Sequence, residues 1–452
     1  MADDASTSDP GSDAAEGRPD GRGSLAVGSA GVGSPADATA GALLLAQIRA
    51  VGYVQADASA GTTRAASAAA ASVDRKLIEI SDPAAERRVF VLGWADGTGP
   101  DPDQHPSAPP RRLSAVPNLV WAVCLAAAWP DPAADPYPGL PFRLAQVLQA
   151  CTDLGAARNN VISALRRTLP GAGLITLSGQ DGRLGLAAAA LPSFAWSALR
   201  RVHERLPHAA LPGRPDVLAG SAAAEVVMSA AVRALPVPPA GPAGGAETVV
   251  HAAVTVLETA RGSVARSDLP WLADPAIRRA VQAALAGCGR ALVPAPDGGW
   301  TTGYLDPIAQ ALAKEQAGTL TSLERAVLAL ILLRTVAIPR AQGRHHHDGW
   351  AGTDHPVTLD ELGTNRQLSR AAITSGIRGL RTAGYVATTS SGGYIPGPAL
   401  ARLSTASREA LWEDLVLLAR PDGYMAEKIR ARRNSAPSTS SHHLTVAIAT
   451  GG

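Results

Sequence analysis

Residues 357–396, VTLDELGTNRQLSRAAITSGIRGLRTAGYVATTSSGGYIP, form the stretch from which the expected fold follows. Thr358 and Ser369 each precede an apolar pattern, and a hydroxyl at such a position can cap the first amides of a helix. Within the second pattern, apolar residues recur at helical spacing between 373 and 380 and give one apolar face. The stretch therefore predicts two short helices joined by a turn.

A β-hairpin is expected directly after the second helix. Ala383 and Gly384 can end that helix, because glycine readily adopts the left-handed backbone that helix C-termini often require. Residues 385–388 and 393–395 then flank a Ser/Gly turn, which is typical of two strands and a tight loop. Helix, turn, helix and hairpin are thus predicted within about forty residues.

This order of elements resembles the winged helix-turn-helix of bacterial regulators of the GntR and MarR kind. The matching pieces are the helix at 359–362, the turn at Ser369 and Arg370, the recognition helix at 371–381, and the first wing strand at 383–386. The resemblance implies that the chain contacts DNA through the recognition helix. It does not specify a particular regulator.

Two glycines depart from the pattern of that family. Gly363 and Gly376 stand where such helices usually carry alanine or a longer residue, and each costs about 1 kcal/mol of helix propensity. The two helices are therefore expected to be held by packing.

A second copy of the motif is predicted in residues 113–206, around LGAARNNVISALRRTLPGAGLI (residues 154–175). Arg158 takes the place of Arg370, and Arg166 that of Arg378. One extra residue near Pro170 is needed to keep the hairpin in step. Because proline interrupts helices, the second recognition helix is expected to end earlier than the first.

Residues 246–306 repeat the same order of elements, with a hairpin turning at 296–299. When Ile277 is matched to Ile373, the two cationic positions become Asp274 and Gln282. This unit is expected to be a structural or partner-binding module. Residues 41–96 predict helices followed by a hairpin, which fits a degenerate winged unit and a simple α+β scaffold equally well.

The expected fold class is mainly α with small β-hairpins, an α+β chain of tandem winged helix-turn-helix domains. The expected boundaries, in chain order, are a disordered tail at 1–40, the degenerate unit at 41–96, a linker at 97–112, a winged unit at 113–206, a linker with a short helix at 207–245, a structural unit at 246–306, a winged unit at 318–400, C-terminal helices at 401–433, and a disordered tail at 434–452.

Composition limits the class of protein. The net charge of +2 is nearly neutral, so a nucleic-acid surface has to come from local clustering of arginine. Abundant Ala, Gly, Pro and Arg is typical of high-GC actinobacterial coding. The acidic N-terminus lacks an apolar core, and no run reaches the roughly 18 apolar residues of a membrane helix. A cytoplasmic, nucleoid-associated protein without membrane contact is expected.

The two cationic recognition helices are the predicted DNA-binding site. A helix can enter the major groove, arginine can bond bidentately to guanine, and hydroxyls and arginine can contact phosphates. The alternative is that these faces are solvated and the winged helices bind protein. The candidate residues are Ser369, Arg370, Thr374, Arg378, Arg381, Arg158, Asn159, Asn160, Arg166 and Arg167.

Metal binding and catalysis are not expected. His345, His346, His347, Asp348 and His355 carry groups that suit a divalent metal, but three adjacent imidazoles rarely converge on one ion, which favours a polar loop. Cys124, Cys151 and Cys288 lack metal-ligand spacing and are expected to be buried thiols. The sequence shows no nucleophile paired with a base, and no cofactor is predicted.

The sequence thus predicts a DNA-binding transcriptional regulator whose partners are double-stranded DNA, a second copy of the chain in a homodimer, and proteins that bind the third unit. Two alternatives stay open. One is a winged-helix scaffold subunit of a condensin-like SMC complex, and the other is a plasmid or phage replication initiator.

Overall fold

The computed structural model describes residues 34–82, 86–95, 113–207, 245–260, 262–295, 297–344, 350, 354–364 and 367–435. These residues are mainly helical, with small antiparallel sheets, as the sequence predicts. They form four units that follow a common order: a helix, a short strand or single bridging residue, one or two further helices, and a hairpin. The expected linkers at 97–112 and 207–245 and most of both expected tails lie outside the described residues.

Unit 1 contains only one helix between its first strand and its hairpin. Its elements are α1 (Pro35–Val51), β1 (Val54–Gln55), α2 (Ala60–Ala71), β2 (Arg75–Asp82) and β3 (Arg87–Trp94), with sheet order β1-β3-β2. The expected end of the N-terminal tail at residue 40 is wrong, because α1 already begins at Pro35. Ser34 caps it by accepting the Asp37 N–H at 3.1 Å, and the proline fits the first helical turn.

Unit 2 has the full set of elements. They are α3 (Ala115–Ala128), β4 (Phe142–Arg143), α4 (Leu144–Asp153), α5 (Arg158–Ser163), η1 (Ala164–Thr168), α6 (Leu169–Gly171), β5 (Ile175–Ser178) and β6 (Asp181–Leu184), with sheet order β4-β6-β5. The segments α7 (Leu186–Ala189), α8 (Ser193–Val202) and η2 (His203–Arg205) follow and pack on the unit.

The expected early end of the unit 2 recognition helix is wrong. The helix runs from α5 to α6 without a break, and η1 is a wider π-helical turn in which Leu169 N–H donates to the carbonyl of Ala164. Pro170 follows at once. Its ring would crowd the carbonyl four residues before it in a regular α-helix, and the wider turn relieves that crowding. The extra residue is therefore accommodated inside the helix.

Unit 3 keeps the order of elements with a shorter middle helix. Its elements are α10 (Ala246–Thr259), the bridging residue Val264, the 3₁₀ turn η3 (Pro270–Ala273), α11 (Pro275–Gly287), β7 (Arg290–Pro294) and β8 (Trp300–Tyr304), followed by α12 (Asp306–Lys314). Val264 pairs with Trp300 and so extends the hairpin on its β8 side, as β1 and β4 extend theirs on the side of the second hairpin strand.

Unit 4 contains the stretch that predicted the fold. Its elements are α13 (Ser322–Leu332), the π turn η4 (Leu333–Ala337), α14 (Ile338–Ala341), the bridging residue Val357, α15 (Leu359–Gly363), α16 (Arg370–Thr382), β9 (Val386–Thr388) and β10 (Tyr394–Pro396), followed by η5 (Pro398–Arg402), α17 (Thr405–Ala419) and α18 (Tyr424–Ser435). The first helix continues through the π turn to Ala341. Pro339 again follows a π turn, as Pro170 does.

One backbone contact recurs in all four units. A residue in the left-handed region precedes each hairpin, and its carbonyl accepts the N–H of a residue just beyond the second hairpin strand. The donor and acceptor pairs are Ala95 to Asp74 at 2.9 Å, Ala187 to Gly173 at 3.0 Å, Leu305 to Gly289 at 3.1 Å, and Ala399 to Gly384 at 3.0 Å. Since this contact does not depend on side chains, it shows that the four units share one backbone design.

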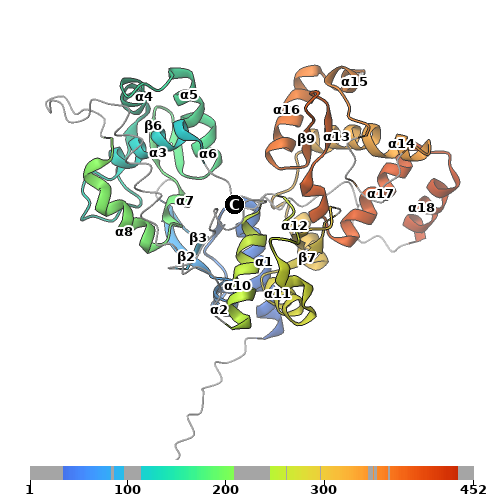
Figure 1. The fold of residues 1–452 in the computed structure, drawn as a ribbon, viewed down its shortest axis with the longest axis horizontal. Helices are drawn as coiled ribbons and strands as arrows, with labels where there is room; N and C mark the ends of the chain where they lie inside the picture. The colour runs from blue at the N-terminus through green and yellow to red at the C-terminus, as the bar shows by residue number, and fades with distance from the viewer. Residues whose placement is uncertain are drawn as a thin grey trace, which may run out of the picture.

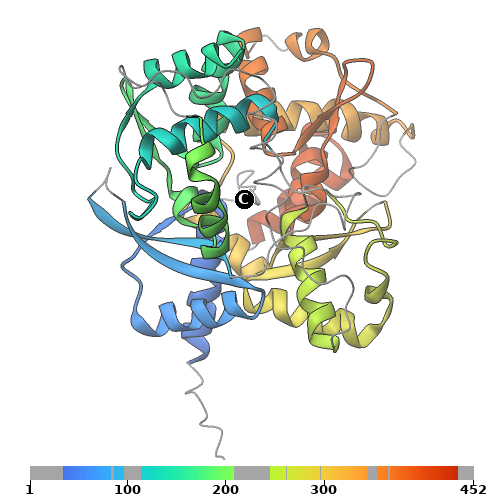
Figure 2. The ribbon, with the colours of Figure 1, turned by 60° about the vertical axis from the view of Figure 1, so that its left-hand side comes forward.

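The four units are arranged as a base and two lobes (Figures 1 and 2). Units 1 and 3 share one hydrophobic core, in which Leu45 and Phe90 pack with Leu257 and Leu285. Units 2 and 4 each have a core of their own and project from this base. Within the described residues, no helix combines the length and apolar composition needed to cross a bilayer.

Candidate nucleic-acid interface

The helix α16 buries one face and exposes the other. Ser369 caps it, because its Oγ accepts the N–H of Ala372 at 3.2 Å. Ile373 and Leu380 are fully buried and Ile377 is nearly so, and all three belong to the core of unit 4. The opposite face of the helix is therefore left to solvent or to a partner.

Gly376 lets α16 approach α13 closely. A Cβ at this position would lie 2.8 Å from Cγ2 of Val327, a fully buried residue of α13. A Cβ at Gly363 in α15 would meet nothing within 4 Å. Close packing therefore accounts for the glycine at 376. It does not account for the glycine at 363.

The exposed face of α16 carries one paired and two unpaired arginines. Arg370 forms an ion pair with Asp360 of α15 at 2.6 Å, and both side chains are exposed. The side chains of Arg378 and Arg381 are exposed and have no hydrogen-bond or ion-pair partner among the described residues. The Thr374 hydroxyl donates to the carbonyl of Arg370 at 2.9 Å, within the helix.

The corresponding face of unit 2 is richer in unpaired groups. Arg158, Asn159 and Asn160 lie in the first turn of α5, and Arg166 and Arg167 lie in the π turn. All five side chains are exposed and have no hydrogen-bond partner within the described parts of the chain. The helix starts without a side-chain cap, so no side chain competes with an anion such as a phosphate for the amides of Arg158 and Asn159.

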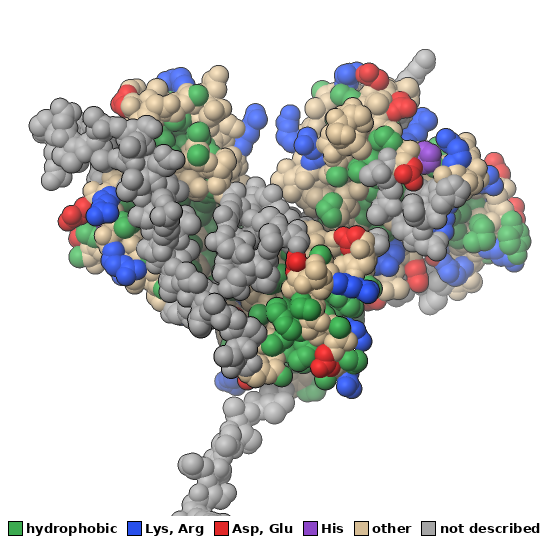
Figure 3. All heavy atoms as spheres, viewed as in Figure 1, with side chains coloured by type: hydrophobic (Ala, Val, Ile, Leu, Met, Phe, Trp, Pro, Cys, Tyr) green, Lys and Arg blue, Asp and Glu red, His purple; other side chains and the backbone are tan. Residues whose placement is uncertain are grey.

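The tertiary structure brings the two faces toward a common space. The helices α5 to α6 and α16 lie on the inner sides of the two lobes, across the gap between units 2 and 4 (Figure 1). The rotated view keeps them next to each other (Figure 2). Lys and Arg side chains stand on both edges of this gap (Figure 3). The gap is thus lined on two sides by cationic helices.

In unit 3 the equivalent helix is α11. It lies in the base, and it differs from α16 in the charged side chains it exposes. Asp274 caps α11 by accepting the Ala276 N–H at 2.7 Å, and Gln282 is exposed. Arg278 is half-buried and donates to the Leu272 carbonyl at 3.1 Å. The helix lies in the base, away from the gap (Figure 1). The structural or partner-binding role expected for this unit stays a prediction.

The pairing of Asp360 with Arg370 had no counterpart in the sequence prediction. The two residues belong to different helices, so helical spacing gives no signal for their contact. It depends on the angle between α15 and α16. The ion pair reduces the charge that Arg370 can offer to a phosphate, which leaves Arg378 and Arg381 as the stronger cationic positions of unit 4.

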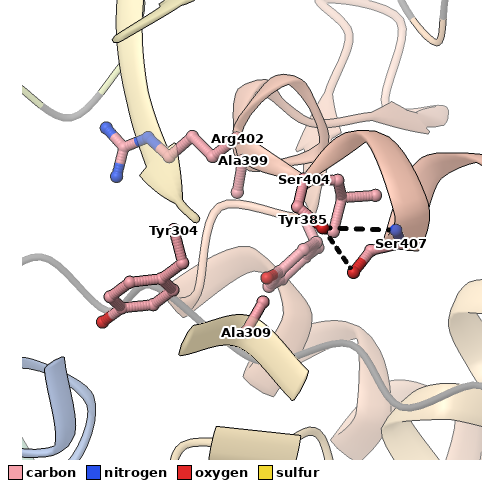
Figure 4. A pocket seen from close by; sticks show the side chains of 8 residues that line it. Tyr304, Ala309, Tyr385, Ala399, Arg402, Ser404 and Ser407 are labelled. Atoms are coloured by element: carbon pink, nitrogen blue, oxygen red, sulfur yellow. Dashed lines mark hydrogen bonds between the residues drawn. The ribbon is translucent and has the colours of Figure 1, made fainter. Parts of the chain in front are cut away.

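A small pocket lies between unit 3 and η5 (Figure 4). It is lined by Tyr304, Tyr385, Arg402 and Ser404 among others, and its volume of about 10 Å³ corresponds to roughly one water molecule. Arg402 donates to the carbonyl of Ala260 at 2.6 Å, and burial lowers its pKa to about 10. Residues of both the base and unit 4 line this pocket, which is too small for an organic ligand.

The metal candidates fall largely outside the described residues, since His345, His346, His347 and Asp348 are not among them. His355 lies with Nε2 3.3 Å from the carbonyl of Arg344. Within the part of the chain that the structure describes, no three His, Cys, Asp or Glu side chains gather as metal ligands. The three cysteines are buried, and burial raises the pKa of each thiol.

Comparison with protein-family models, with curated proteins and with solved structures gave no match to this chain. Evidence about its function comes from its own residues and their geometry.

Proposed function

We propose that this protein is a sequence-specific binder of double-stranded DNA, a non-enzymatic transcriptional regulator built from tandem winged-helix units. The observation that supports this most directly is the pair of cationic helices, α5 to α6 and α16, on the two walls of one gap. On these two helices, five arginine side chains are exposed without partners among the described residues, namely Arg158, Arg166, Arg167, Arg378 and Arg381.

The chemistry of these side chains suits a duplex. Guanidinium groups neutralise phosphates and release counterions, which provides affinity without sequence preference. Arginine also bonds bidentately to guanine in the major groove, and asparagine does the same to adenine. Exposed Asn159 and Asn160 beside Arg158 therefore offer both positioning and base-reading groups in one helical turn.

The order of elements in units 2 and 4 supports the same proposal. Each has a helix, a strand or bridging residue, two helices and a hairpin, and in each the second hairpin strand lies in the middle of the pairing. This order supports a winged helix-turn-helix, a fold in which the last helix enters the major groove and the hairpin flanks it. The capping box at Thr358 and Glu361 fixes the start of α15.

The test is a salt titration of DNA binding. Arg378→Ala with Arg381→Ala should weaken binding to a random-sequence duplex of roughly 30 bp, about three helical turns. Because each lost phosphate contact removes about one unit of the slope of log affinity against log salt, the slope should fall by about two. Fluorescence anisotropy at several salt concentrations measures both quantities.

Arg279→Ala with Arg430→Ala is the matched control. It removes the same charge from exposed positions on α11 and α18, away from the gap. Its salt slope should equal that of the unmodified protein. Equal losses in both double variants would mean that binding follows overall charge, and no loss in the α16 variant would reject the proposed role of that helix.

A protein-binding scaffold is the second candidate, and one surface favours it. Leu418, Tyr424 and Met425 are 53%, 70% and 60% exposed around the connection between α17 and α18. Figure 3 shows hydrophobic side chains gathered over this end of unit 4. Such a surface is typical of a contact with another protein. Absence of any duplex binding at low salt would favour this candidate over DNA recognition.

A further inference from the structure

We propose that a single copy of this chain binds one duplex between its two lobes and recognises a site without two-fold symmetry. This inference rests on the proposed DNA binding and names the kind of site. We call the helices α5 to α6 and α16 the two reading helices. Three features of the molecule support the inference: the shared core of units 1 and 3, the different side chains on the two reading helices, and the position of these helices on opposite sides of the gap.

The contact between units 1 and 3 joins two halves of one chain, as a subunit interface joins the two chains of a homodimer. Units 1 and 3 bury Leu45, Val254 and Leu257 in one common core. Arg49 of α1 and Glu258 of α10 form an ion pair across this contact at 2.9 Å, with side chains only 6% and 3% exposed. Both lobes belong to the same chain as this base, so a second copy is not required to present two reading helices.

The two reading helices differ at matched positions. The apolar matches Val161 to Ile373 and Leu165 to Ile377 set the alignment of α5 to α6 with α16, and all four of these side chains are buried. In this alignment Asn159 and Asn160 correspond to Ala371 and Ala372, and Arg167 corresponds to Gly379. The amide groups of unit 2 therefore have no counterpart in unit 4.

These differences predict different bases in the two halves of the site. Homodimeric helix-turn-helix proteins present two identical helices and so bind pseudo-palindromic operators. Here, unit 2 offers asparagine, which pairs with adenine, whereas the exposed face of α16 carries arginine, which pairs with guanine, and no amide side chain. Arg370 is also paired with Asp360, while Arg158 is not. The site should consequently be bipartite and asymmetric.

The facing placement of the helices predicts one duplex in contact with both lobes. The helices α5 to α6 and α16 lie across the gap from each other (Figure 1), and Figure 3 shows free space between the upper ends of the two lobes. Because the negative charge of a duplex would lie between two cationic walls, both lobes would add to the affinity for the same molecule.

Selection of bound sequences from a random duplex library, with the full chain, tests the proposal. The enriched motif should lack two-fold symmetry, and native mass spectrometry of the shortest enriched duplex should show one chain per duplex. Asn159→Ala with Asn160→Ala should reduce base preference about ten-fold in one half of the motif only. Arg378→Ala should do so in the other half only.

Two results would overturn this inference and leave the proposed function standing. One is a palindromic motif bound by two chains, and the other is a single-chain complex in which the three substitutions, at Asn159, Asn160 and Arg378, affect the same half of the motif. Failure to bind any duplex at low salt would overturn the proposed function as well. Arg279→Ala, on α11, should leave the sequence preference in both halves of the DNA motif unchanged. Circular dichroism should show that each variant keeps its helix content.

Discussion

At the residue scale, Gly376 and Gly363 lie in neighbouring helices but in opposite surroundings. Both lower the helix propensity of their segments. Only Gly376 has a packing reason, because its missing Cβ leaves room for Val327. The sequence identifies both glycines as costly in a helix, but it cannot tell which of them the tertiary structure requires.

Substitution of these glycines should therefore change stability in opposite directions. Gly376→Ala should lower the free energy of unfolding of unit 4 by about 1–3 kcal/mol, since the added methyl group collides with a buried valine. Gly363→Ala should raise it by up to about 1 kcal/mol, since the position is exposed and open. Urea midpoints of the two variants measure the difference.

The outcome that contradicts this explanation is a higher midpoint for both variants. It would mean that helix propensity outweighs the contact with Val327. Neither substitution removes a charge or a candidate DNA contact, so loss of DNA affinity can be attributed to loss of folded unit 4.

At the element scale, the π turn in unit 2 contains the one residue by which the helix α5 to α6 exceeds α16. The large apolar side chains that the helix α5 to α6 buries are Val161, Leu165 and Leu169, at spacings of four and four. In α16 the corresponding residues are 373, 377 and 380, at spacings of four and three. The surplus residue therefore lies between Leu165 and Leu169, inside η1.

Removal of one residue from this turn should be tolerated. Deletion of Arg167 together with Pro170→Ala should leave a regular α-helix with the buried spacing of α16, because the surplus residue and the proline that crowds the helix are both gone. We expect a cooperative thermal transition and unchanged helix content, measured by circular dichroism.

Deletion of Arg378 from α16 is the matched control. That helix has no surplus residue, so the deletion rotates every later position by about 100° and turns Leu380 out of the core. Unit 4 should then unfold. If both deletions are equally disruptive, the π turn is a packing requirement of unit 2 rather than an accommodated insertion.

At the scale of the whole molecule, buried charges join the two halves of the base. Glu258 lies among Arg49, Arg75 and Arg290, at 2.9 Å from Arg49 and 4.0 Å from Arg75. Burial by itself would raise the pKa of this carboxyl, but the three guanidinium groups outweigh burial and hold it below its usual range. The ionised carboxylate therefore stabilises the contact between units 1 and 3.

This arrangement predicts that the contact between units 1 and 3 loses stability at acidic pH. Because the pKa of Glu258 is lower in the folded protein than in the unfolded chain, its contribution to stability is complete at neutral pH. It is lost as the pH falls below about 4.3, the usual pKa of glutamate, and through the lower folded value. Thermal midpoints measured from pH 7 to pH 3 should fall over this range.

Glu258→Gln should remove that part of the acid dependence. The variant should also be less stable at pH 7 by about 3–5 kcal/mol, because it leaves buried guanidinium groups without their counter-ion. A variant that is as stable as the unmodified protein, with the same loss toward pH 3, would show that other carboxyl groups cause the acid sensitivity.

Much of the local structure was predictable because its signals lie close together in the sequence. The hydroxyl caps at Thr358 and Ser369, the glycine turn at Gly384 and the apolar spacing of α16 gave the helices and the hairpin of unit 4. The start of α1 at Pro35 was missed, because its small side chains resemble those of the tail before it. The continuous helix through Pro170 was missed, because a π turn has no sequence signature of its own.

Sequence by itself determined the elements, the repeat of their order, and the arginines that stay exposed on two helices. Those properties depend on spacings of a few residues, which the chain displays directly. Only the tertiary structure decided that units 1 and 3 share a core, that Asp360 pairs with Arg370, and that α5 to α6 and α16 face one gap. These contacts join residues distant along the chain or on separate helices, and their free energy comes from burial and charge pairing that no local pattern reveals.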